Sequence, residues 1–260
     1  MALIVLTSAC GSPGVTTTAL GLALTWPRPV LLVEADPTGG SPIFAGYFRG
    51  ESTPPGGLID LAMAHRHGCL ADALPRSVVP IPDSMVQVLP GTRAHGQARS
   101  LVSLWEPLAA ELRALERNGQ DVIVDAGRLG LAGSPEPLIH GADMTLLVMR
   151  STVPAIAGAS SWASTLRGDF ENSGAAANLG VLMVGAGDPF VPREVSKVLR
   201  LPVLGSLASD EPSARVFALG EKPKKRWDSA PLVRSLRATG GSISAAIATN
   251  SVDLAVAGGQ

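Results

Sequence analysis

The sequence predicts an α/β protein in which a doubly wound, mostly parallel sheet is covered by helices on both faces. Short apolar runs of strand length alternate along the chain with longer amphipathic segments of helical spacing. Several runs are apolar at consecutive positions, which is typical of strands buried on both faces of a parallel sheet. The chain has 29 glycines and 21 prolines, which cluster in the connections. These observations together favour a three-layer α/β/α arrangement with right-handed crossovers.

Seven segments have the length and composition of strands. Ala2–Leu6 is apolar at all five positions, and Asp121–Asp125 holds three apolar residues between two aspartates. The other five are equally short and rich in valine, leucine and methionine, so we expect them to be buried as well. The predicted strands are Ala2–Leu6, Val30–Glu34, Val86–Pro90, Asp121–Asp125, Met144–Met149, Leu179–Val184 and Pro202–Leu207.

Six amphipathic segments predict helices. The predicted helices are Thr16–Thr25, Leu58–His65, Ala98–Arg117, Val153–Leu166, Arg193–Leu199 and Leu232–Thr249. Asp188–Pro189 and Pro192 form a turn and helix entry ahead of Arg193. Because the alternation contains no linker, we expect a single domain over residues 1–249 and a flexible tail over residues 250–260.

The first predicted strand runs into a glycine-bearing loop and then a helix, in the stretch SACGSPGVTTTALGLAL. Such a loop turns successive backbone N–H groups toward a phosphate at the positive end of a helix, and a hydroxyl there can bind Mg²⁺. By itself the loop departs from the G-x-x-x-x-G-K-S/T pattern, and a glycine-rich turn without a ligand explains it about as well. The candidate nucleotide-binding residues are Gly11, Ser12, Gly14, Val15, Thr16 and Thr17.

Four later segments raise the significance of this loop, because they resemble those of ParA/MinD-type P-loop ATPases in the same order. LLVEADPTGGS resembles the family's DAD-P-x-G segment, and DVIVDAGRLG resembles its Walker B strand. GADMTLLVMRSTVPAIAGA and LRLPVLGSLASDEPSARVFALG resemble two further family segments. The resemblance covers roughly residues 2–235 and is closest to the TadZ/CpaE pilus-assembly branch. It implies a P-loop NTPase-like fold.

The resemblance also implies roles for individual residues. Asp36 matches the carboxylate that orients the attacking water, and it is the catalytic residue if the protein is active. Thr16 and Asp125 match the groups that hold Mg²⁺, and the implied ligand is ATP or ADP with Mg²⁺. Each carboxylate also has a purely structural explanation, because Asp36 precedes Pro37 and favours a turn, and Asp125 ends a strand where it can cap the next turn.

The loop lacks both lysines of the family. Cys10 stands at the signature lysine, which reaches across a dimer in the family, and Val15 stands at the Walker lysine. A lost charge-assisted contact costs about 1.5–3 kcal/mol, and in phosphoryl transfer the catalytic loss is larger. Gly185 replaces the base-contacting asparagine, so adenine specificity has no support. The sequence therefore predicts a pseudo-ATPase that binds nucleotide weakly or not at all, and the absence of any cofactor is an equally open alternative.

The leading functional hypothesis is a positioning or assembly adaptor that acts through protein partners, such as a pilus or secretion ATPase assembly. Membrane contact would then be peripheral and made only through partners, and the resemblance implies a possible homodimer. One alternative is an ATP hydrolase that uses a substitute cation, with four candidates: Arg28, Arg49, Arg128 and Arg150. Another alternative is a partitioning protein that binds DNA nonspecifically.

Composition bears on these alternatives. The 21 basic and 22 acidic residues nearly cancel, and the only dense basic run is Lys222–Arg226, which argues against a nucleic-acid partner. The two cysteines and the His65/His67 pair offer no metal-ligand spacing. No apolar run is long enough to span a bilayer, and the N-terminus lacks the basic segment of an export signal, so we expect a cytoplasmic protein.

Overall fold

The predicted strands form the centre of the molecule. In the computed structural model, which describes residues 2–54 and 56–257, eight strands make one sheet in the order β3-β4-β2-β5-β1-β6-β7-β8. Every neighbouring pair is parallel except the pair of β3 and β4. The strands are β1 (Leu3–Ser8), β2 (Val30–Glu34), β3 (Val79–Pro80), β4 (Val86–Leu89), β5 (Asp121–Arg128), β6 (Met144–Arg150), β7 (Leu179–Val184) and β8 (Val203–Leu207). All seven predicted strands are present, and the predicted fold class is confirmed.

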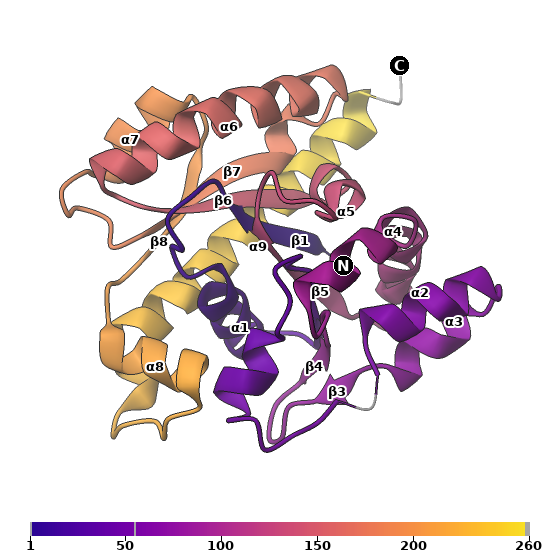
Figure 1. Cartoon of the computed structure of the whole chain (residues 1–260). Helices are drawn as coiled ribbons and strands as arrows, with labels where there is room; N and C mark the ends of the chain where they lie inside the picture. The colour runs from indigo at the N-terminus through magenta and orange to yellow at the C-terminus, as the bar shows by residue number, and fades with distance from the viewer. Residues whose placement is uncertain (1, 55, 258–260) are drawn as a thin grey trace.

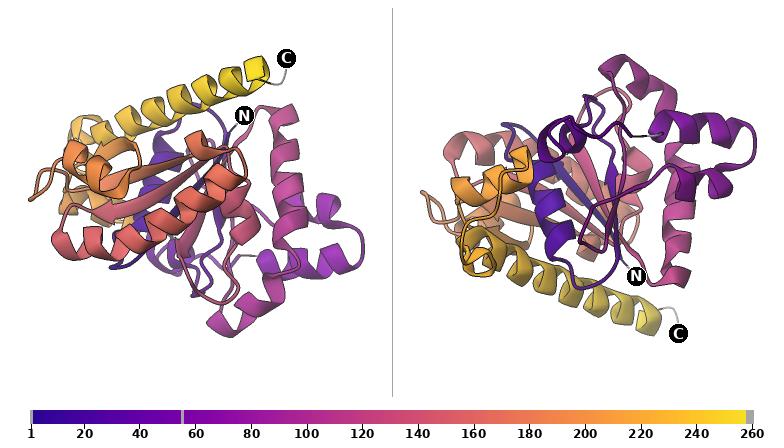
Figure 2. Two further views of the ribbon diagram at one scale, coloured as in Figure 1. Left: turned by 90° about the horizontal axis from the view of Figure 1, so that it is seen from above. Right: turned by 90° about the horizontal axis from the view of Figure 1, so that it is seen from below.

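Helices cover both faces of this sheet (Figures 1 and 2). One face carries α2 (Leu58–Arg66), α3 (Leu70–Ala73), α4 (Trp105–Ala114), α5 (Glu136–His140), α6 (Val153–Asn172) and α7 (Pro192–Leu199). The opposite face carries α1 (Val15–Thr25), α8 (Glu211–Leu219) and α9 (Pro231–Ala257). A π-helical turn, η1 (Ile43–Tyr47), also lies on that face. Because both faces are covered, the central strands are apolar at nearly every position, as predicted.

The predicted helix over Ala98–Arg117 is wrong as a continuous element. The structure has a 3₁₀ segment, η3 (His95–Leu101), then α4, then a second 3₁₀ segment, η4 (Leu115–Asn118). Pro107 explains the break, because its ring clashes with the preceding turn and proline is tolerated only in the first turn of a helix. Accordingly α4 begins at Trp105 and holds Pro107 in its first turn.

The last helix runs further than the sequence indicated. Residues 250–257, expected to belong to a flexible tail, continue α9, and residues 258–260 lie outside the described residues. The Asn250 side-chain amide donates hydrogen bonds to the Ala177 carbonyl at 2.8 Å and to the Asn178 side-chain oxygen at 3.2 Å. These contacts connect the end of α9 to the turn before β7. In the part of the chain that the structure describes, no helix is both long and apolar enough to cross a membrane.

The fold brings three loops to one edge of the sheet. Since β1, β2 and β5 are parallel neighbours, their carboxyl ends lie together. The loops that follow them, over residues 9–14, 35–42 and 129–135, contain or adjoin the candidate site residues. This common edge is where ligands bind in open α/β sheets.

Candidate functional site

The loop between β1 and α1 is tightly curved. Gly11, Ser12 and Gly14 have positive φ angles of 75°, 43° and 96°. Gly14 caps α1 from the left-handed region, which glycine adopts without steric cost. Gly11 and Ser12 are exposed, and Gly14 and Thr17 line a cavity of about 360 Å³. The start of α1 therefore points its free N–H groups into an accessible space.

Thr16 and Asp125 meet directly behind this loop. The Thr16 hydroxyl donates a hydrogen bond of 2.5 Å to the Asp125 carboxylate, and the Gly127 N–H donates another of 3.0 Å. Burial raises the pKa of Asp125 to about 7. The bonds from Thr16 and Gly127 oppose this rise, and the charges of Asp36 and Glu34 add to it. A hydroxyl and a carboxylate are the oxygen ligands that Mg²⁺ prefers beside phosphate, so the donor set fits this ion.

Asp36 is the third member of the group. Its carboxylate lies against Gly127 and fills the space that a Cβ there would need, because an added Cβ would lie 2.2 Å from the Asp36 Cγ. The same carboxylate accepts hydrogen bonds from the Thr38 N–H at 2.8 Å and the Thr38 hydroxyl at 2.7 Å. The turn-forming role that the sequence allowed for Asp36 is therefore present, and so is its approach to the Asp125 loop.

Replacing Gly127 with alanine is expected to lower the free energy of unfolding by about 2–5 kcal/mol. Alanine at the φ of +62° costs about 1–2 kcal/mol, and its methyl group overlaps Asp36, which adds about 1–3 kcal/mol. The matched control is Gly119→Ala, because Gly119 has a φ of +68° and nothing within 4 Å of an added Cβ. Urea unfolding measures both variants, and equal losses would show that Asp36 does not press on Gly127.

Glu34 holds the loop that carries Asp36. Its buried carboxylate accepts hydrogen bonds from the Ser41 hydroxyl, the Ile43 N–H at 2.9 Å and the Gly91 N–H at 3.3 Å. Burial raises the pKa of Glu34 despite these three donors. This structural role of Glu34 depends on partners up to 57 residues away along the chain.

The side chains at the two positions where the resemblance predicts lysines both face protein. Val15 is 7% exposed and belongs to the core beneath α1. The Cys10 side chain packs on α6 at Gly158, where an added Cβ would lie 2.4 Å from the Cys10 Sγ. The sequence gave no signal for this contact, because helix α6 is distant along the chain. Neither side chain supplies a positive charge to the loop.

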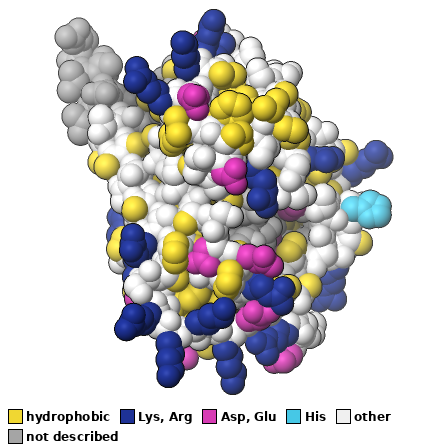
Figure 3. Space-filling view, turned by 90° about the vertical axis from the view of Figure 1, so that its left-hand side faces the viewer, with side chains coloured by type: hydrophobic (Ala, Val, Ile, Leu, Met, Phe, Trp, Pro, Cys, Tyr) yellow, Lys and Arg dark blue, Asp and Glu magenta, His cyan; other side chains and the backbone are white. Residues whose placement is uncertain are grey.

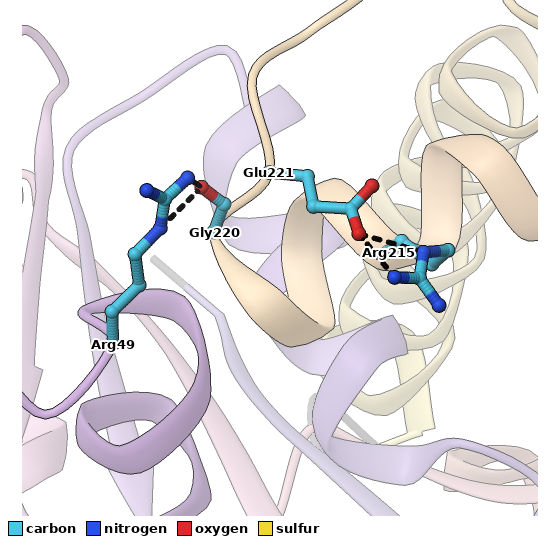
Figure 4. A network of polar contacts seen from close by, with 4 residues as sticks. All are labelled: Arg49, Arg215, Gly220 and Glu221. Atoms are coloured by element: carbon cyan, nitrogen blue, oxygen red, sulfur yellow. Dashed lines mark hydrogen bonds and ion pairs between the residues drawn. The ribbon is translucent and has the colours of Figure 1, made fainter.

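The four arginines considered as substitute cations lie in different places. Arg28 pairs with Asp121 at 2.8 Å, at the opposite edge of the sheet. The Arg49 guanidinium donates to the Gly220 carbonyl after α8, next to an Arg215–Glu221 ion pair (Figure 4). Arg128 is exposed at the end of β5. Arg150 lines the same cavity as Gly14 and Thr17.

Figure 3 shows the side of the molecule that carries α7 and α8, with acidic side chains near its middle and most Lys and Arg side chains toward its edge. Asp210 and Glu211 also line the loop cavity, beside Arg150. The cavity therefore combines one cation with two carboxylates. In the described residues, no group of three or more His, Cys, Asp or Glu side chains is arranged to hold a metal ion.

Comparison with known proteins defines the fold. No protein-family model matches the sequence, and no curated protein matches it. The cell division ATPase MinD of Pyrococcus furiosus is similar in structure, with a TM-score of 0.71 and 20% identity over 94% of this chain and 99% of that chain. A ParA family ATPase from Chlorobium tepidum TLS gives a TM-score of 0.72 and 16% identity, over 92% and 99% of the two chains. The septum site-determining protein MinD of Pyrococcus horikoshii OT3, complexed with Mg-ADP, gives 0.69 and 18%, over 92% and 94%.

The chain therefore has the P-loop NTPase-like α/β fold of the MinD and ParA-family ATPases. A structural likeness at these identities establishes the fold alone, because one fold can carry many different functions.

Proposed function

We propose that this protein is a MinD/ParA-like positioning or assembly adaptor that binds Mg-nucleotide weakly and hydrolyses it slowly or not at all. The observation that carries the proposal is the contrast between two sets of side chains around the loop that follows β1. Thr16, Asp125 and Asp36 converge on the metal side, whereas Val15 and Cys10 turn toward protein on the side where two lysines are expected. The scaffold for binding is kept, and the charge for catalysis is missing.

The arrangement assigns distinct tasks to the residues of the loop. Backbone N–H groups at the start of α1 would hold the phosphates, and Thr16 and Asp125 would hold Mg²⁺, which screens phosphate charge when it is bound. The Mg-ADP complex of the Pyrococcus horikoshii MinD, which has the same fold, supports a nucleotide of this kind. Without the Walker lysine the complex loses about 1.5–3 kcal/mol, a factor of about 10–150 in affinity.

A protein that hydrolyses nucleotide slowly would act mainly by binding other proteins. The positioning roles of MinD and ParA-type proteins are consistent with this kind of action. The sequence likeness to the TadZ/CpaE branch makes a pilus or secretion ATPase assembly our proposed partner. A homodimer remains part of the proposal, formed without help from a lysine at position 10.

Calorimetric titration with Mg-ADP and Mg-ATP tests the nucleotide part. Asp125→Asn is expected to weaken Mg-nucleotide binding about tenfold or more, because it removes a charged metal ligand. Binding of the same nucleotide in EDTA is expected to stay unchanged or to tighten. The control is Asp143→Asn, since this carboxylate accepts from the Leu3 N–H at the opposite edge of the sheet. Absence of binding heat at millimolar nucleotide in every protein would overturn the proposal.

The second candidate is an ATP hydrolase that uses Arg150 as its cation, favoured by the position of this residue in the loop cavity. If so, Arg150→Met and Asp36→Ala each abolish Mg-dependent turnover, while Arg128→Met leaves it unchanged. Turnover at the background level in the unmodified protein excludes this candidate and favours the adaptor.

A further inference from the structure

A second cavity, near the start of α9, shares wall residues with the loop cavity. It has a volume of about 520 Å³ and lies between the ends of β7 and β8 and the start of α9. The two cavities share Leu207, Ala208 and Ser209 in their walls. The second cavity is therefore the neighbouring space into which the sugar and base of a nucleotide held at Gly14 and Thr17 would extend.

Two opposite charges line this second cavity. Asp188 comes from the connection between β7 and α7, and Arg234 comes from α9. Among the described residues, neither side chain has a hydrogen bond or ion pair with another side chain or with the backbone. The Ser235 hydroxyl, in contrast, is already engaged, because it donates to the Leu232 carbonyl at 2.9 Å and accepts from the Ala208 N–H at 3.1 Å. Asp188 and Arg234 are thus the charged groups available to a ligand.

The backbone that carries Asp188 is held in place. The buried Ser151 hydroxyl lies 2.6 Å from the carbonyl oxygens of both Gly185 and Asp188. The Gly185 N–H donates to the Leu207 carbonyl at 2.9 Å, and the Gly187 N–H donates to the Phe190 carbonyl at 2.8 Å. Because the connection is fixed before a ligand arrives, less ordering is needed when the ligand binds.

The two charges match one purine better than the other. An ionised carboxylate only accepts hydrogen bonds, and guanine offers it two donors, N1–H and the 2-amino group. Adenine has a lone pair at N1, which a carboxylate repels. Arginine only donates, and guanine O6 and N7 are its preferred acceptors, whereas adenine places an amino donor at position 6.

We propose that this cavity binds guanine, with Asp188 accepting from the N1–H and the 2-amino group and Arg234 donating to O6 or N7. The protein then takes Mg-guanosine nucleotides in preference to Mg-adenosine nucleotides. This inference rests on the proposed nucleotide binding at the loop, and it adds the identity of the base.

Calorimetric titration of the full chain with Mg-GDP, Mg-ADP and the Mg²⁺ complex of xanthosine diphosphate tests the inference. The unmodified protein is expected to bind Mg-GDP about tenfold or more tightly than Mg-ADP, the value of one charged hydrogen bond. Asp188→Ala is expected to abolish this preference. Asp188→Asn is expected to move the preference to the xanthosine nucleotide, because asparagine accepts from N1–H and donates to the 2-oxo group of xanthine.

The exchange of base preference is a readout that a structural role of Asp188 would not produce. Arg234→Ala is expected to reduce the ratio of the Mg-GDP affinity to the Mg-ADP affinity. Arg237→Ala serves as its control, because Arg237 pairs with Asp228 and does not line the cavity. Binding of Mg-ADP as tight as that of Mg-GDP overturns the guanine inference alone. Absence of binding by every nucleotide, also in a Val15→Lys background, overturns the proposed nucleotide function and the guanine inference with it.

Discussion

Replacing Val15 with lysine is expected to raise the affinity for Mg-nucleotide by about 10–150-fold, the value of one charge-assisted contact of about 1.5–3 kcal/mol. Val15 is the first residue of α1, directly after Gly14. A lysine there has a long stem that can follow the apolar surface beneath the helix while its ammonium reaches the loop. The restored charge meets phosphates that the backbone already orients. Calorimetric titration with Mg-ADP and Mg-ATP measures the gain.

The matched control is Val15→Met, which lengthens the same side chain without adding charge. Thermal unfolding of both variants shows whether the substitution is tolerated at this 7% exposed position. If folded Val15→Lys binds nucleotide no better than Val15→Met, phosphates do not lie at the start of α1. That outcome would falsify the assignment of the loop as a phosphate site.

Replacing Asp125 with asparagine is expected to stabilise the nucleotide-free protein at pH 8, by at most about 4 kcal/mol. The folded-state pKa of Asp125 is about 7, above the ordinary value of 3.8. Between these values the folded protein binds more protons than the unfolded chain, so stability falls as the pH rises from about 4 to about 7. Three pKa units correspond to about 4 kcal/mol. Asparagine removes this loss, and it keeps both bonds by accepting from the Gly127 N–H and donating to the Thr16 hydroxyl.

Urea unfolding from pH 4 to pH 8, in buffer without Mg²⁺, gives the comparison. The two proteins are expected to be nearly equal in stability at pH 4 and to diverge up to pH 7. Glu34 stays in both proteins, and its raised pKa gives each a residual decline of the same sign. A difference that does not depend on pH would show that Asp125 titrates normally in the folded protein.

The two predictions together describe a site that keeps a carboxylate at a cost to stability. A buried acid that destabilises the folded state at neutral pH is typical of a functional site, here one that would bind a cation. The apolar Val15 removes the charge that would normally accompany such a cation. The proposed function, Mg-nucleotide binding without fast hydrolysis, accommodates both features.

The sequence by itself determined the layered architecture. Consecutive apolar residues at Ala2–Leu6 and at Leu146–Met149 indicate burial on both faces of a sheet, which is a local property of composition. The resemblance to ParA/MinD-type segments, rather than periodicity or composition, singled out Thr16, Asp36 and Asp125 as candidate site residues. Three helices, α3, α5 and α8, escaped prediction. For α3 and α5 the reason is length, because four or five residues are too few to establish a helical period.

Only the tertiary structure decided what the altered loop positions face. The direction of Val15 depends on the rotation of α1 over the sheet, and the contact of Cys10 with Gly158 joins residues 148 positions apart. The anchoring of α9 by Asn250 and the common cavity of Asp188 and Arg234 also arise between distant segments. Local sequence encodes periodicity and burial, whereas contacts between distant residues exist only once the layers have packed.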